Sequence, residues 1–181
     1  TVSFESHRYL LYNDGSNVVP AVLTVTIFEG DTPNDNLYLT EVMYSPQSNG
    51  FDYEWVEFYN PNDIAIFVNS WTIADNEQKD NIVSEENEII TIPAKSVGIL
   101  TSSPSTFRET YVNYKYVFSV EDVAIGNGLG TSETIILSKN SYNDAFTYTS
   151  EYGANGNGKT LTRSCYNCAN WNEAVSSPGT I

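Results

Sequence analysis

The stretch at residues 53–73 reads YEWVEFYNPNDIAIFVNSWTI and contains two of the three tryptophans of the chain, Trp55 and Trp71. On one interpretation of the pleat, its first part alternates apolar and polar side chains, and it ends at residues 60–63, NPND. That tetrad is typical of a turn, because Asn and Asp bond their own backbone and Pro fixes φ. Two further short apolar runs follow, IAIFV and WTI. We therefore predict three consecutive strands, a β-meander whose large aromatic side chains supply a core.

The composition favours an all-β protein of one domain, with or without an extension. The chain has 181 residues, which is long enough to bury a sizeable core. It contains 13 tyrosines and is rich in Ser, Thr, Asn and Gly, which favours short strands joined by polar turns over a helical bundle.

The charge of the chain excludes several classes of partner. The formal net charge is −15, with only 8 basic residues, so phosphate backbones and anionic membranes find no basic surface to bind. No apolar run approaches the roughly 20 residues of a membrane helix. The chain begins at Thr1 rather than Met, which we interpret as removal of a signal. We expect no nucleic-acid partner, no membrane insertion and an extracellular or cell-surface location.

The opening stretch is also one of several pieces that together resemble a known family. Glu-Trp-Val-Glu-Phe-Tyr-Asn-Pro at residues 54–61, followed by Trp71 and Asp75, is similar to the lamin tail domain. The other pieces occur in the family's order: LTEVMYSP at 39–46, IPA at 92–94, Leu161 and Arg163, and Asn170, Trp171, Ala174, Pro178 and Gly179. The resemblance covers about residues 37–181 and implies an immunoglobulin-like β-sandwich.

Residues 1–36 lie outside the resemblance and form a candidate N-terminal extension. The strongest β run of the chain is Val18–Phe28, although Pro20 places its start at an edge or outside the ladder. This run can add a strand to the sheet of its own sandwich. Residues 1–12 then remain as a terminal extended segment, and residues 29–36 form an acidic join.

Other local patterns predict further elements. Ser103 followed by Pro104 is typical of a helix start, which predicts a helix of one or two turns. Residues 133–138 and 145–149 are expected to pair as a hairpin. We also predict a strand at residues 114–118 and a last clear strand at residues 160–164, with an irregular tail beyond it.

Two motifs suggest chemistry that their context does not favour. The segment from Gly153 to Thr160, GANGNGKT, satisfies the P-loop pattern, but a P-loop needs a buried parallel strand before it and a helix after it. Here a strand is expected after it, so we interpret it as a Gly-rich hairpin. His7 is the single histidine and would have to carry any Ser-His-Asp or Cys-His catalysis. We interpret it as an exposed strand residue.

Cys165 and Cys168 enclose two residues in the sequence CYNC. A structural zinc site needs four ligands, and the other soft donor, His7, is far away in sequence. A thioredoxin-like pair would require a helix start in an α/β fold. We favour a structural disulfide that fixes the tail, which also agrees with an oxidising, extracellular location.

Acidic side chains are more suited to calcium than to catalysis in this chain. Oxygen ligands clustered in one loop can fill the six to eight positions of Ca²⁺. The candidates are Glu29, Asp31 and Asp35, with Asp75, Glu77 and Asp80 second, and neither group has the spacing of a known calcium loop. We interpret both groups as solvated acidic loops and expect no cofactor, with calcium as the alternative. We interpret Glu54 and Glu57 as surface or hydrogen-bonding positions and assign no catalytic pair.

These observations support two hypotheses about function. The first is a non-catalytic, secreted structural subunit that assembles with copies of itself by adding its N-terminal strand to a neighbouring sheet. The assembly residues would be Val2, Phe4, Tyr9, Leu10, Leu11 and Tyr12. The alternative is a cell-surface adhesion or accessory module that binds calcium or glycans, for which Tyr111, Tyr114 and Tyr116 offer aromatic rings.

Overall fold

The protein is described by a computed structural model. It describes residues 35–47, 50–84, 90–112 and 114–180 in full, and the backbone of the strands at residues 3–13 and 18–28. The chain divides into two compact units, Thr1–Asn34 and Asp35–Ile181.

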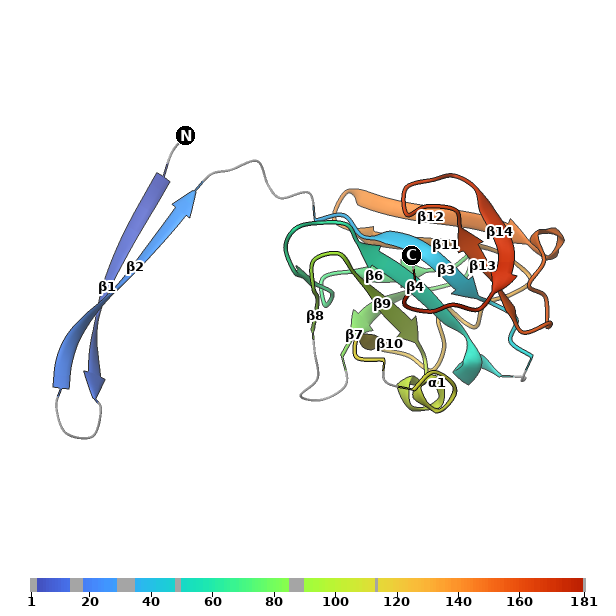
Figure 1. The fold of residues 1–181 in the computed structure, drawn as a ribbon, viewed down its shortest axis with the longest axis horizontal. Helices are drawn as coiled ribbons and strands as arrows, with labels where there is room; N and C mark the ends of the chain where they lie inside the picture. The colour runs from blue at the N-terminus through green and yellow to red at the C-terminus, as the bar shows by residue number, and fades with distance from the viewer. Residues whose placement is uncertain are drawn as a thin grey trace. The chain divides into compact units, whose positions relative to one another are not determined.

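Strands are the main regular elements of both units (Figure 1). The strands are β1 (Ser3–Asn13), β2 (Val18–Phe28), β3 (Tyr38–Met43), β4 (Trp55–Asn60), β5 (Ile66–Phe67), β6 (Thr72–Ala74), β7 (Lys79–Val83), β8 (Thr91–Ile92), β9 (Ser96–Thr101), β10 (Val117–Val120), β11 (Ser132–Lys139), β12 (Tyr142–Thr149), β13 (Lys159–Arg163) and β14 (Trp171–Val175). The helical elements are α1 (Pro104–Thr110) and two 3₁₀ turns, Phe51–Tyr53 and Ser150–Tyr152.

The N-terminal unit is a long antiparallel hairpin. β1 pairs with β2 over eleven positions, from Ser3 opposite Phe28 to Asn13 opposite Val18. The run at Val18–Phe28 is confirmed as a strand, but it does not extend the sheet of the second unit, because β1 and β2 form a separate two-stranded sheet. The expectation that residues 1–12 remain an unpaired terminal segment is therefore wrong, because residues 3–12 lie in β1 and pair with β2.

The second unit is built on one ten-stranded sheet in the order β12-β11-β6-β7-β10-β9-β4-β3-β13-β14. All its pairs are antiparallel except β9–β10, which is parallel. The sheet curls so that its end strands approach each other, and Phe146 of β12 stacks on Trp171 of β14 with ring centroids 3.9 Å apart. The result is an all-β sandwich whose two halves enclose the core (Figure 1).

Two apolar clusters stabilise this sandwich. The larger lies between the two halves of the sheet and includes Phe58, Trp71 and Phe118, all at most 1% exposed. The smaller lies on the outer face of β4 and β9, where α1 places Phe107 against Trp55. Both tryptophans of the opening stretch are therefore packing residues, as the sequence predicted.

The strand pairing of the opening stretch differs from the prediction. The meander is wrong: β4 pairs with β3 and β9, β5 pairs with β8, and β6 pairs with β7 and β11. The three strands therefore do not pair with one another. Local alternation predicts that a strand forms but not which strand it pairs with, because pairing depends on contacts distant in sequence.

The local predictions had mixed outcomes. The helix begins at Pro104 as expected, and β11 and β12 pair as the predicted hairpin. The strand expected at residues 114–118 instead begins at Val117, so Tyr114 and Tyr116 precede it. The tail contains one more strand than expected, β14, which pairs with β13.

Candidate functional site

The most unusual polar feature of the sandwich is a pair of buried glutamates on adjacent strands. Glu41 of β3 lies opposite Glu57 of β4, and both are 0% exposed. Alternation along β4 places Glu57 on the same face as Trp55 and Tyr59, away from the main core. This outer face is covered, so the interpretation of Glu57 as a surface position is wrong, whereas its hydrogen-bonding role is confirmed.

Each of these carboxylates accepts hydrogen bonds from both the sheet and the C-terminal tail. The Thr40 hydroxyl donates to Glu57 over 2.7 Å, and the Thr160 hydroxyl donates to Glu41 over 2.5 Å. From the tail, the amide of Ser177 donates to Glu41 over 2.9 Å and the amide of Gly179 donates to Glu57 over 2.5 Å. The pair therefore fixes the tail across the outer face of the sheet.

Burial determines the protonation of this pair. It raises the pKa of Glu57 to about 7, because a carboxylate removed from water loses the hydration of its charged form. The bonds from Thr40 and Gly179 oppose this rise, while the nearby Glu41 charge adds to it. Burial also raises the pKa of Glu41. Carboxylates that serve as a glycosidase pair must reach a sugar, and these two are enclosed by protein donors.

A groove of about 540 Å³ lies beside the covered pair. Its sides come from β4, from the start of β9, from the segment before β10 and from the tail. The lining residues are Tyr59, Lys95, Ser96, Val97, Tyr114, Lys115, Tyr116 and Gly179. The groove therefore combines three tyrosines with two of the 8 basic residues of the chain.

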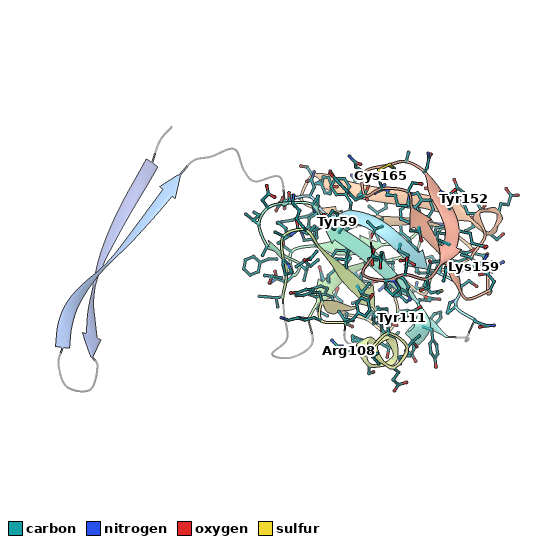
Figure 2. All side chains as sticks on the ribbon, viewed as in Figure 1. Tyr59, Arg108, Tyr111, Tyr152, Lys159 and Cys165 are labelled. Carbon is teal, nitrogen blue, oxygen red and sulfur yellow. A yellow bond between two sulfur atoms is a disulfide. The ribbon has the colours of Figure 1, made fainter. Side chains whose placement is uncertain are left out.

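The three tyrosines singled out from the sequence do not all line the groove. Tyr114 and Tyr116 line the groove. Tyr111, labelled in Figure 2, follows α1, and its hydroxyl forms a hydrogen bond of 2.6 Å with the hydroxyl of Ser176. The ring of Tyr59, which the sequence argument did not single out, completes the groove. The sequence signal that could have identified Tyr59 is its position two residues after Glu57, which places both residues on the same face of β4.

A second cluster of carboxylates holds a loop rather than a ligand. Glu54 accepts the amide of Leu129 over 2.8 Å, Asp80 accepts the amide of Gly126 over 2.7 Å and Asp75 accepts the amides of residues 77, 78 and 127. Burial raises the pKa of Glu54 to about 7, despite the bond from Leu129. Glu54 is only 6% exposed, so of the two alternatives expected for it the surface position is wrong and the hydrogen-bonding position is confirmed.

Gly126 gives a direct test of this loop. Its φ is +58°, and a Cβ there would collide with the Asp75 carboxylate. We expect Gly126→Ala to lower the free energy of unfolding by about 2–3 kcal/mol, through left-handed strain and overpacking. Gly156→Ala is the matched control, since its φ is +69° but the nearest atom to a new Cβ, the Ser45 hydroxyl oxygen, is 3.9 Å away. Equal losses in chemical denaturation would contradict the proposed clash.

The calcium candidates are only partly described. Glu29 and Asp31 lie outside the described residues, and Asp35 forms an ion pair with Lys139 at 2.5 Å. Among the described residues, no group of three or more His, Cys, Asp or Glu side chains is arranged to hold a metal ion. Calcium binding therefore stays a prediction.

The remaining motifs have structural environments. Cys165 and Cys168 form a disulfide, which confirms the preferred interpretation (Figure 2). The segment that satisfies the P-loop pattern ends in strand β13, and Lys159 binds Glu173 over 2.6 Å. His7 lies in β1 opposite Thr24. Of the assembly residues, Phe4 and residues 9–12 lie in β1, while Val2 is outside the described residues.

These observations define the class of protein: an immunoglobulin-like β-sandwich. A family model of the Lamin Tail Domain matches residues 30–160, so the chain belongs to the lamin tail domain family. Comparison with curated proteins and with solved structures gave no match. In the part of the chain that the structure describes, no helix has the length and apolar character needed to cross a membrane.

Proposed function

We propose that the chain is a non-catalytic, extracellular structural subunit that assembles with copies of itself through its N-terminal hairpin. The observation that carries the proposal is the pairing of β1 with β2 as a sheet of their own, separate from the sandwich. The donated element is therefore a hairpin rather than the single strand expected from the sequence.

The hairpin is expected to need contacts with another molecule for its stability. An isolated two-stranded hairpin is marginally stable in water and needs a further strand or a packed face. The register places one set of residues on a common face, because alternate residues share a side. That set is Phe4, Ser6, Arg8, Leu10, Tyr12, Val19, Ala21, Leu23, Val25 and Ile27. Eight of these ten residues are apolar or aromatic, which favours burial of this face on another molecule.

The outer edge of β1 is the better candidate for pairing. Every residue of β1 carries a backbone N–H, whereas Pro20 removes one donor from β2. Strand addition satisfies such an edge with main-chain hydrogen bonds. If each copy donates its hairpin to the sandwich of the next, the contact is head-to-tail, and a head-to-tail contact that does not close builds a filament.

Removal of residues 1–34 tests the proposal. These residues form a compact unit, so the sandwich at residues 35–181 retains its own contacts when they are absent. We expect the full chain to form oligomers or filaments in light scattering and electron microscopy. The shortened chain should be a monomer with an unchanged melting transition. Filaments formed by the shortened chain, or a full chain that stays monomeric at high concentration, would contradict the proposal.

A matched pair of substitutions refines this test. Val25 lies on the apolar face of the hairpin and Thr26 lies on the opposite face. We expect Val25→Lys to raise the concentration needed for assembly at least tenfold, because a buried charge is costly. Thr26→Lys adds the same charge on the other face and should raise the concentration needed for assembly less.

A second candidate function is a cell-surface module that binds glycans or calcium. The groove with its three tyrosines favours this candidate, since aromatic rings pack on sugar rings. Calcium would raise the melting temperature by several degrees at millimolar concentration, and a chelator would reverse the shift.

A further inference from the structure

The groove beside the tail has walls that are fixed by other contacts. Tyr59 lies in β4 opposite Val97 of β9, and the carbonyl of Tyr116 accepts a hydrogen bond from the amide of Ile99 over 2.9 Å. On the remaining side, the amide of Gly179 is bound to the Glu57 carboxylate. A ligand would therefore meet a preformed surface and would pay little to order it.

Gly179 allows the tail to lie close to a tyrosine of the groove. Its φ is +85°, and a Cβ at this position would lie 2.5 Å from the hydroxyl oxygen of Tyr114. Gly179 is thus fixed by the hydrogen bond of its amide to the Glu57 carboxylate and by its close approach to Tyr114. The tail side of the groove is therefore closely packed.

The size and lining of the groove indicate the kind of molecule that it accepts. Ligand sites in proteins commonly have volumes of about 300–1,000 Å³, and this groove has about 540 Å³. Tyr59, Tyr114 and Tyr116 are only partly exposed, so each combines apolar ring surface with a polar hydroxyl. The C–H faces of a pyranose ring pack on such rings, and its hydroxyls bond to phenol groups.

Of the two lysines in the groove, Lys115 favours a negatively charged ligand. Lys95 is paired with Asp63 over 2.9 Å, whereas Lys115 makes no salt bridge within the described residues and lies over the ring of Tyr116 at 5.6 Å. Lys115 is exposed at the rim and thus has an ammonium group available for an anion. The net charge of −15 repels a distant polyanion, but salt screens that repulsion beyond about 8 Å. The charges that line the groove therefore determine whether an anion binds there.

We propose that this groove binds a short acidic oligosaccharide, with the tyrosines packing on the sugar rings and Lys115 binding a uronic acid carboxylate. The proposal rests on the second candidate function and gives it a site and a class of ligand. It does not depend on assembly through the hairpin, because the described residues that line the groove all belong to residues 35–181.

Calorimetric titration of the full chain with trigalacturonate tests the proposal. We expect saturable binding, and at least tenfold weaker binding of the fully methyl-esterified trisaccharide, which has the same rings without the charge. Lys115→Glu should also weaken binding of the acid form at least tenfold. Lys79→Glu makes the same change at an exposed residue of β7, outside the groove, and should alter the affinity less than twofold.

Three results would overturn the proposal: no binding at millimolar trigalacturonate, equal affinity for the acid and the ester, or no effect of Lys115→Glu. None of them bears on oligomer formation, which is measured separately by light scattering. If the chain assembles but binds neither sugar, only the inferred ligand fails. If it binds the acid but stays monomeric, the groove stands and self-assembly fails.

Discussion

Asp144→Ala is expected to lower the free energy of unfolding by about 3–5 kcal/mol, because it leaves the buried charge of Arg163 without its partner. The two side chains are 13% and 8% exposed, and two hydrogen bonds of 2.7 and 3.1 Å join them. The same carboxylate accepts the amide of Leu39 over 2.8 Å, so the substitution also removes the acceptor of a backbone donor. The pair links β12 to β3 and β13, close to where the curled sheet meets itself.

Chemical denaturation of the variants measures this loss. Asp63→Ala is the matched control, since its ion pair with Lys95 is largely exposed and is expected to contribute less than about 1 kcal/mol. The double variant Asp144→Ala/Arg163→Met should recover part of the loss, because it removes the isolated charge. A loss at Asp144 no larger than that at Asp63 would show that this ion pair does not stabilise the closure.

Stability is expected to fall as the pH rises from 5 to 8. Glu57 and Glu54 have a pKa of about 7 in the folded protein, against an ordinary value of 4.5. Between these values the folded state holds protons that the unfolded state has released, so each group stabilises the fold below pH 4.5 and loses this contribution as the pH approaches 7. A shift of one unit corresponds to about 1.4 kcal/mol, which gives about 3 kcal/mol for each group.

Denaturation curves at several pH values, with and without a substitution, isolate the contribution of Glu57. Glu57→Gln keeps an oxygen for the Gly179 amide and cannot ionise, so the dependence on pH should become weaker. Glu151→Gln removes the same charge from an exposed side chain and should leave the dependence largely intact. Moderate salt screens the general repulsion of the acidic surface but acts little on buried groups. A wild-type curve that rises from pH 5 to 8, or equal slopes for the two variants, would contradict the assignment.

The buried glutamates show where sequence patterns become ambiguous. In Trp55-Val56-Glu57-Phe58-Tyr59, large apolar residues occupy both faces of the strand, which is the pattern of a strand covered on both sides. A glutamate on either face of such a strand must be buried or bonded. That signal was available, but the partner of Glu57 on the tail is 122 residues away, and no local pattern indicates it.

The sequence by itself determined the all-β class, the lamin tail domain family, the long β2 strand, the helix start at Pro104 and the disulfide. The all-β class follows from composition, and the family from a resemblance carried by several pieces spread over about residues 37–181. The other features follow from residue types within a few positions of each other, because turn chemistry, alternation and caps are local. The tertiary structure alone decided how the strands of residues 53–73 pair, that β1 pairs with β2, that the tail covers Glu41 and Glu57, and that a groove forms beside it. These features depend on contacts between distant segments and on the burial that such contacts produce, and burial is what raises the pKa of Glu57 from its ordinary value to about 7.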